Sequence, residues 1–289
     1  MPTRRTGNRE TPTRRVEVGT LVLAILLSLP GLSRAQPLSR GHTVWLITGS
    51  AVTHLAHARG GRHLLQGYLN HQTTWIYGKS ADAPSRALRV RGAASLAGFR
   101  RAVTRRGRAV LLDLEHWPLT PGPEQHHPLA TYARAAAWAH RQGKILIATP
   151  AFDLVHSLEP RYRGRIYPEF LRLDLAGALA SDAGVYEIQA QGAENHPARY
   201  RTLVIAIVRQ IRKINPHTVI LAGLSTGPSG HKTTAETLYR DARATRNQVS
   251  GYWLNIPGRG RACPRCTKPR PAVAIRFLRR MAQSVDASP

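Results

Sequence analysis

The feature that most constrains this fold is an alternation of short apolar segments with helical segments from Thr43 to the C-terminus. Short runs rich in Val, Ile, Leu and aromatic residues predict strands, and the amphipathic stretches between them predict helices. The predicted strands are 43–48, 74–77, 109–115, 144–149, 185–191, 219–224 and 251–256, with an eighth near 87–90. Strands that alternate with helices build a parallel sheet, so the sequence predicts an α/β protein.

Helices are predicted between these strands from apolar periodicity and from Gly and Pro at their ends. The predicted ranges are 54–69 (interrupted by Gly60 and Gly61), 93–106, 128–142, 169–180, 197–214, a helix opened by the capping box Thr233–Glu236, and 271–283. Helix 197–214 is the clearest. Its apolar positions form one stripe that should face the core: Tyr200, Leu203, Val204, Ile207, Val208 and Ile211.

The length then selects among parallel-sheet folds. From residue 43 onward the chain is close to the ~250 residues of a closed barrel of eight strand–helix units. We therefore expect residues 43–289 to form a single (β/α)8-like, TIM-type barrel, with seven of its strands clearly readable. The alternative is a doubly wound open sheet. That fold usually has a Gly-rich turn after its first strand, whereas the segment Thr48–Thr53 contains one glycine.

The first 35 residues predict an export signal peptide. Five Arg lie within the first 15 residues, the fifteen residues Val18–Leu32 carry no charge, and small residues surround the expected cleavage point after Ala35. The apolar run is shorter than the ~20 residues of a membrane-spanning helix. We expect a secreted, extracellular protein in which 36–42 is a short linker. The alternative is an uncleaved signal, through which the chain would contact a membrane.

The two cysteines, Cys263 and Cys266, form a lone C-x-x-C motif. In an exported protein such a pair predicts a disulfide, here in the loop before the last helix. The alternatives are a redox dithiol and half of a metal site. A redox motif should open a helix beside a strand, whereas this motif lies in a loop rich in Gly, Arg and Pro. Two cysteines exclude a four-cysteine zinc site.

The chain is strongly basic, with 42 Lys+Arg against 16 Asp+Glu and a formal net charge of +26. Such a field attracts anionic polymers non-specifically, including nucleic acid, cell-wall polymers and phospholipid. The basic residues are scattered, with no block of five like charges and no zinc-finger, helix-turn-helix or aromatic RNA-binding motif. We therefore expect no sequence-specific nucleic-acid partner.

Polar residues concentrate at the carboxyl ends of three predicted strands, on the side that faces into a barrel. Side chains alternate along a strand, so Leu111, Asp113 and Glu115 share one face of strand 109–115. The same alternation directs Glu187, Gln189 and Gln191 inward from strand 185–191, and Trp253 and Asn255 inward from strand 251–256. Barrel enzymes place their chemistry at these carboxyl ends.

This set of residues predicts carbohydrate chemistry. Two neighbouring carboxylates repel, so one of them retains a proton, which suits protonation of a glycosidic oxygen. We expect Glu115 to be the general acid, Asp113 an orienting carboxylate and Glu187 a third catalytic candidate. Aromatic rings stack on sugars and amides bind hydroxyl and N-acetyl groups. The predicted substrate-binding residues are Trp117, Gln189, Gln191, Trp253 and Asn255. The expected partner is an oligosaccharide or cell-wall polysaccharide, with no cofactor and no metal.

The segment Leu111–Trp117 resembles the D-x-E strand end of the chitinase-like (family 18) glycoside hydrolases. The resemblance implies that Glu115 is the general acid and that Asp113 positions the substrate's N-acetyl group, which acts as the nucleophile. Further aspartates of that family are replaced here by Arg108 and Leu111. The segment Gly251–Asn255 resembles the family's late barrel tryptophan. The overall layout also resembles uncharacterised secreted TIM-barrel proteins of actinobacteria, which implies export and fold but no substrate.

Three other functions fit parts of the sequence. The barrel could bind glycans or a cell surface without catalysis. A metal-dependent phosphodiesterase would draw its ligands from carboxylates and imidazoles near the D-x-E segment: Asp113, Glu115, His116, Glu124, His126 and His127. A serine esterase would use Ser225 in the G-x-S-x-G segment Gly223–Gly227. That motif requires a helix directly after the serine, whereas Pro228 intervenes here.

Overall fold

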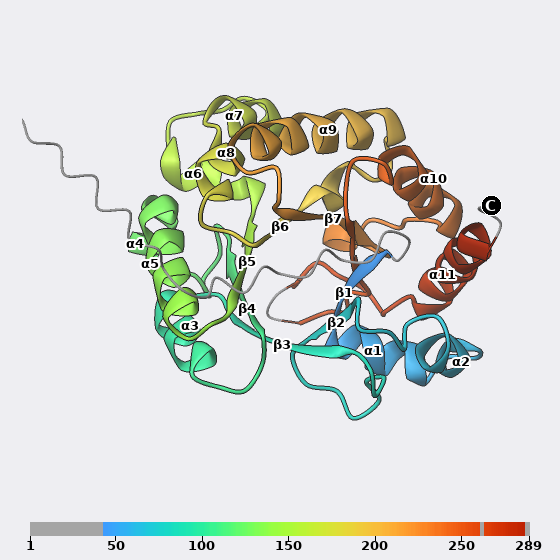
Figure 1. Cartoon of the computed structure of the whole chain (residues 1–289). Helices are drawn as coiled ribbons and strands as arrows, with labels where there is room; N and C mark the ends of the chain where they lie inside the picture. The colour runs from blue at the N-terminus through green and yellow to red at the C-terminus, as the bar shows by residue number, and fades with distance from the viewer. Residues whose placement is uncertain (1–42, 261–262, 287–289) are drawn as a thin grey trace, which may run out of the picture. The chain divides into compact units, whose positions relative to one another are not determined.

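The computed structural model describes residues 43–260 and 263–286. In these ranges eight parallel strands pair in chain order and close into a barrel, since β1 also pairs with β8. The predicted TIM-type α/β fold is therefore confirmed, including the eighth strand (Figure 1). The strands are β1 Val44–Thr48, β2 Thr74–Tyr77, β3 Leu88–Ala93, β4 Ala109–Leu114, β5 Ile145–Pro150, β6 Val185–Ile188, β7 Val219–Ser225 and β8 Gly251–Asn255.

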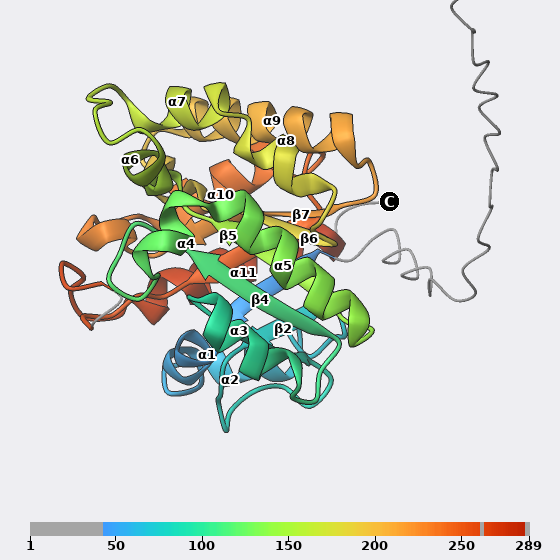
Figure 2. The ribbon, with the colours of Figure 1, turned by 90° about the vertical axis from the view of Figure 1, so that its left-hand side faces the viewer.

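Helices surround the strands in Figure 1, with α9 along the top of the view and α11 at the right. Figure 2 shows α5 lying across β4 and β5, against which it packs. The α-helices are α1 Gly49–Ala56, α2 Gly61–Gln66, α3 Leu96–Val103, α4 Gly122–His126, α5 Pro128–Arg141, α6 Val155–Leu158, α7 Ile166–Arg172, α8 Leu175–Ala180, α9 Pro197–Ile214, α10 Ala235–Thr245 and α11 Pro271–Asp286. Three short 3-10 helices are η1 Phe152–Leu154, η2 Ala190–Ala193 and η3 Pro228–Gly230.

The strand faces follow the predicted alternation. Outward side chains of the strands, such as Leu112 and Tyr186, join the helices in one large core. Inward side chains form a separate cluster inside the barrel: Val44, Leu46, Trp75, Val90, Ala109, Leu111, Ile147, Val185, Leu221 and Trp253. Because both faces of most strands are buried, those strands read as nearly continuous apolar runs. The exception is β3, where Arg89 and Arg91 are exposed.

Helix α9 has the predicted bounds and buries its whole predicted stripe, from Tyr200 to Ile211. Pro197 is its first residue, where a missing N–H costs nothing because that group has no partner within a helix. Burial of each large apolar side chain contributes roughly 1.5–3 kcal/mol, so this one stripe is a major stabilising contact of the barrel.

Several helix starts differ from the predictions because local hydrogen bonds decide them. Helix α1 begins at Gly49, five residues before the predicted start, since the Thr48 hydroxyl accepts a hydrogen bond from the Ala51 N–H at 3.2 Å. The predicted capping box at Thr233 is wrong. Thr234 caps α10 instead and accepts from the Thr237 N–H at 3.1 Å.

Two further differences lie between β5 and β7. The predicted helix 169–180 is broken into α7 and α8 by Asp174, whose φ of 48° is left-handed. A short polar residue such as Asp tolerates this conformation better than most. The predicted strand 185–191 ends at Ile188, and Gln191 lies in η2 instead.

The predicted signal peptide, 1–35, and linker, 36–42, lie outside the described residues. Across 43–260 and 263–286, the structure has no helix with the length and apolarity needed to cross a membrane.

Closure of the barrel requires a glycine at position 251. A Cβ atom there would lie 1.9 Å from the Val44 carbonyl oxygen on β1, and backbone cannot move aside as a flexible side chain can. We expect Gly251→Ala to lower the free energy of unfolding by about 3 kcal/mol, as overpacking does. Urea denaturation measures this loss. Gly122→Ala is the matched control, because a Cβ at Gly122 meets nothing within 4 Å. Equal stability of the two variants would contradict the account.

Candidate active site

The inner face of the barrel changes from apolar to polar toward the carboxyl ends of the strands. On β4 the next inward-facing residue after Leu111 is Asp113. On β8 the next inward-facing residue after Trp253 is Asn255. Above this polar layer lies a cavity of about 1220 Å³. Seven of the eight predicted catalytic and substrate-binding residues line it: Asp113, Glu115, Trp117, Gln189, Gln191, Trp253 and Asn255.

Asp113 is held at the base of the cavity by two side-chain donors, Thr149 on the neighbouring strand β5 and Gln189 directly after β6. The Gln189 Nε2 donates to Asp113 Oδ1 at 3.0 Å and to the Thr149 carbonyl oxygen at 3.1 Å, which fixes the amide's orientation. The Thr149 hydroxyl also lies 3.0 Å from Asp113 Oδ1. The Asp113 side chain is therefore fixed, and the residue is 7% exposed.

Glu115 follows β4 in a tight turn that is braced from several sides. The Thr120 hydroxyl oxygen accepts from the Glu115 N–H at 3.2 Å and from the Trp117 Nε1 at 2.8 Å. Asp153, in η1 after β5, accepts the His116 N–H at 2.9 Å. These contacts direct both Glu115 and Trp117 to the cavity. Thr120 and Asp153 were not predicted, because their contacts span turns that no motif encodes.

Burial and mutual repulsion govern the protonation of the carboxyl pair. Loss of solvent and the neighbouring carboxylates of Asp113 and Asp153 raise the pKa of Glu115 to about 9. Burial raises the pKa of Asp113 to about 7, while hydrogen bonds from Thr149 and Gln189 oppose that rise. At neutral pH Glu115 thus retains its proton, and Asp113 is the first of the pair to ionise.

Glu187 does not line the cavity. It is fully buried inside the barrel on β6, and neither carboxyl oxygen has a hydrogen-bond partner in the described structure. Burial, followed by Asp113 and Glu115, raises its pKa well above the ordinary value for Glu. Glu187 is therefore a neutral acid beneath the mouth.

Aromatic rings from β2 and β8 meet at the mouth of the cavity. Tyr77, at the end of β2, contacts Trp253 of β8 edge-to-face at a centroid distance of 6.1 Å. Tyr77 lines the cavity and was missed by the sequence analysis, although the alternation of Trp75 and Tyr77 on one strand was a signal for it. Gly92 leaves space for the ring, since a Cβ there would lie 2.6 Å from Tyr77 Cε2.

Gln191 reaches the cavity from η2 rather than from a strand. Its side-chain amide lies over Gly223 of β7, where a Cβ would come within 2.4 Å of the amide carbon. The inward position expected for Gln191 is thus reached by a different local structure, and a glycine on the adjacent strand makes room for it.

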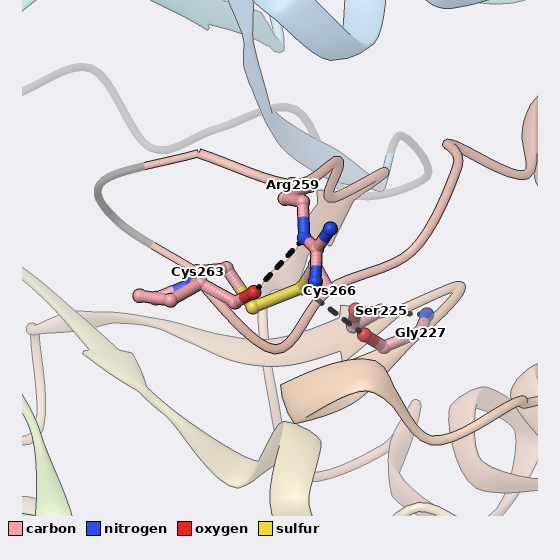
Figure 3. Close-up of a disulfide and its surroundings, with 6 residues drawn as sticks. Ser225, Gly227, Arg259, Cys263 and Cys266 are labelled. Atoms are coloured by element: carbon pink, nitrogen blue, oxygen red, sulfur yellow. Dashed lines mark hydrogen bonds between the residues drawn. A yellow bond between two sulfur atoms is a disulfide. The ribbon is translucent and has the colours of Figure 1, made fainter.

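One wall of the cavity is the loop between β8 and α11. The sulfur atoms of Cys263 and Cys266 are bonded at 2.08 Å within this loop, as shown in Figure 3. The Cys266 sulfur also lies 3.8 Å from the Gly227 carbonyl oxygen, which joins the loop to the segment after β7. The Arg270 guanidinium donates to the carbonyl oxygens of Thr226 and Thr233 at 3.1 and 3.0 Å.

The residues considered as metal ligands do not converge. Glu124 accepts the Leu96 N–H at 2.7 Å, and His126 Nδ1 contacts the Ser157 carbonyl oxygen at 2.7 Å. His116 Nδ1 lies 2.8 Å from the Ser157 hydroxyl. In the ranges that the structure describes, no three His, Cys, Asp or Glu side chains gather as metal ligands do.

Ser225 lies at the end of β7 and is 1% exposed. Its hydroxyl accepts from the Gly227 N–H at 3.2 Å, and its own N–H donates to the buried carboxylate of Glu194. Helix α10 starts only at Ala235. Ser225 therefore lacks the exposed position of a nucleophile elbow and acts in local structure.

Comparison with known proteins adds little to this geometry. No protein-family model matches the chain, and no curated protein matches it. Solved structures that match include a chitinase from Chromobacterium violaceum ATCC 12472, at 11% identity and a TM-score of 0.48, covering 86% of this chain and 100% of that one. A probable tagatose 6 phosphate kinase from Sinorhizobium meliloti 1021 matches at 12% identity and a TM-score of 0.38, covering 74% of this chain and 65% of that one. Such distant likenesses carry no argument about the site.

Glu187 makes stability depend on pH in a direction that can be tested. The pKa of Glu in an unfolded chain is about 4.3, whereas burial raises the pKa of Glu187 in the folded protein. Between the unfolded and the folded pKa, folding therefore takes up a proton. The stability that neutral Glu187 supplies is complete below the unfolded pKa and is lost as pH rises. Relative to the native chain, Glu187→Gln should gain up to about 1.4 kcal/mol in unfolding free energy per pH unit above about pH 5.

Urea denaturation from about pH 5 to about pH 8 measures this gain. The matched control is Glu236→Gln, on the exposed side of α10, which should show no such gain. A stability difference between native and Glu187→Gln proteins that stays constant with pH would refute the assignment of Glu187 as a buried neutral acid.

Proposed function

We propose that this barrel is a glycoside hydrolase whose acid is Glu115 and whose orienting carboxylate is Asp113. The observation that carries the proposal is a pair of carboxyl groups at the end of β4 that face one large cavity. Asp113 is buried, Glu115 is half-buried, and their pKa values are separated. Groups whose surroundings separate their pKa values suit acid and base roles in one reaction.

The proton state fits the first step of glycoside cleavage. Glu115 holds a proton at neutral pH and can donate it to the glycosidic oxygen as the bond to the sugar breaks. Ionised Asp113, fixed by Gln189 and Thr149, can accept a hydrogen bond from the substrate and stabilise positive charge that develops on the sugar. By its resemblance to the chitinase-like strand end, Asp113 would hold an N-acetyl group in position to attack.

The rest of the cavity suits a sugar chain. Trp117, Tyr77 and Trp253 offer aromatic surface, and the amides of Gln191 and Asn255 can both donate and accept hydrogen bonds. A cavity of about 1220 Å³ has room for several sugar units. The proposed partner is an oligosaccharide or a cell-wall polysaccharide.

We also propose that the protein is exported with residues 1–35 as its signal. The Cys263–Cys266 disulfide supports this, because such bonds persist in oxidising compartments.

The direct test is cleavage of soluble chitin, peptidoglycan and glucan oligosaccharides by the full chain and by Glu115→Gln. The substitution keeps size and removes the acidic proton, so we expect turnover to fall by at least about 100-fold. Oligosaccharide binding, measured by calorimetry, should remain. Glu236→Gln, outside the cavity, is the control and should keep full turnover. Binding of a glycan without cleavage by any of these proteins would instead establish a non-catalytic glycan-binding barrel.

The pH dependence supplies a second test, on a cleaved substrate. We expect kcat/KM to rise as Asp113 ionises near pH 7 and to fall as Glu115 loses its proton near pH 9. Thr149→Val removes a hydrogen bond that lowers the pKa of Asp113, so the acid limb should move to higher pH by up to about one pH unit. The buried control is Thr131→Val on α5, which removes a hydroxyl that donates to the His127 carbonyl oxygen. An acid limb that is identical in all three proteins would exclude Asp113 as its origin.

A further inference from the structure

Among the residues that the structure describes, the β8–α11 loop places three cationic side chains along the wall of the cavity. Arg259, Arg265 and Lys268 are exposed and line the cavity. None of the three forms an ion pair with a carboxylate in the described ranges. The sequence between Ile256 and Pro271 contains no acidic residue. The loop therefore presents unneutralised positive charge to whatever enters the cavity.

The cations project from a braced backbone. The Arg259 N–H donates to the Thr267 carbonyl oxygen at 3.2 Å, and the Cys263–Cys266 disulfide closes the turn between them. The Arg265 carbonyl group packs against Gly230, where a Cβ would come within 2.4 Å of its oxygen. A backbone held by such contacts at Arg259 and Arg265 loses little conformational freedom when a ligand binds, which favours affinity.

The acidic groups of the cavity do not cancel this charge. Glu115 keeps its proton at neutral pH, and Asp113 supplies at most one negative charge against the three cations. A cleft with charge of one sign and low-dielectric walls concentrates its field and attracts ligands of the opposite sign. Guanidinium groups also match the geometry of carboxylate and phosphate oxygens.

We infer that the substrate is an anionic glycan, whose carboxylate or phosphate groups bind Arg259, Arg265 and Lys268 while a glycosidic bond lies at the carboxyl pair. The position of the cleaved bond rests on the glycosidase proposed above. The preference for an anionic sugar chain rests on the cationic wall alone and can be tested without turnover.

The test measures binding to the full chain carrying Glu115→Gln, so that no substrate is consumed. Three probes share one backbone of β-1,4-linked N-acetylhexosamines: a neutral chitin oligosaccharide, peptide-free peptidoglycan strands with lactyl carboxylates, and a chitin oligosaccharide phosphorylated on its primary hydroxyls. At low salt, one or both anionic probes should bind about tenfold more tightly than the neutral probe, since three exposed ion pairs contribute about two- to threefold each. The difference should shrink as salt is added. Whichever anionic probe binds more tightly identifies the preferred oxyanion.

A charge-matched pair of variants separates this wall from the overall charge of the protein. Substituting Arg259, Arg265 and Lys268 together with Gln should abolish the anionic preference and leave binding of the neutral probe unchanged. Substituting Arg105, Arg106 and Arg108 with Gln removes the same charge before β4, at the opposite end of the barrel, and should leave the preference intact. Equal affinity for all three probes, or equal losses in the two triple variants, would overturn the inference. Failure of the glycosidase proposal would instead appear as absent turnover by the native chain, with these binding differences preserved.

Discussion

The closure of the barrel between β1 and β8 is the constraint on which the mouth depends. The contact of Gly251 with the Val44 carbonyl group sets how closely the last strand approaches the first. That approach brings Trp253 and Asn255, near the end of the chain, to the same cavity as Tyr77 from β2. A side chain at position 251 would separate strands at the seam, and the aromatic part of the site would open with it.

Within the closed barrel, burial decides the chemistry. Burying an ionised carboxylate among apolar strands costs free energy, so each acid either keeps its proton or accepts hydrogen bonds from nearby donors. Asp113 gathers donors from Thr149 and Gln189, whereas Glu187 has none and is neutral. Glu115, half-buried at the mouth, has its pKa raised by burial and by the negative charges of Asp113 and Asp153, while Gln189 is its one side-chain donor. The order of ionisation thus follows from the number of hydrogen-bond donors that each acid has.

Much of this arrangement could be predicted from the sequence, because strand alternation is a local rule. Alternation places Asp113 on the inner face of β4 and Trp253 on the inner face of β8. Glu115 and Gln189 lie one residue beyond the ends of β4 and β6, and both still line the cavity. The turns are different. Thr120 braces Glu115 across five residues, and Asp153 reaches the same loop from the end of β5. Such contacts depend on how two loops meet in space, which no periodicity records.

In the loop that carries the disulfide, too, the sequence predicts a local feature but not the contacts with distant residues. The cysteine spacing predicts the local bond, but only the fold shows that the loop covers one side of the cavity. Its docking depends on distant residues: Gly230 gives space to Arg265, and Arg270 donates to two carbonyl groups near β7. Arg270 thus joins the loop to the segment after β7. Arg259 donates only within its own loop, to the Pro264 carbonyl oxygen at 3.4 Å, and Arg259, Arg265 and Lys268 form no ion pair with a carboxylate in the described ranges. The basic composition of the chain therefore serves two purposes in one loop, and only the geometry separates the arginine that holds the wall from the cations that face a ligand.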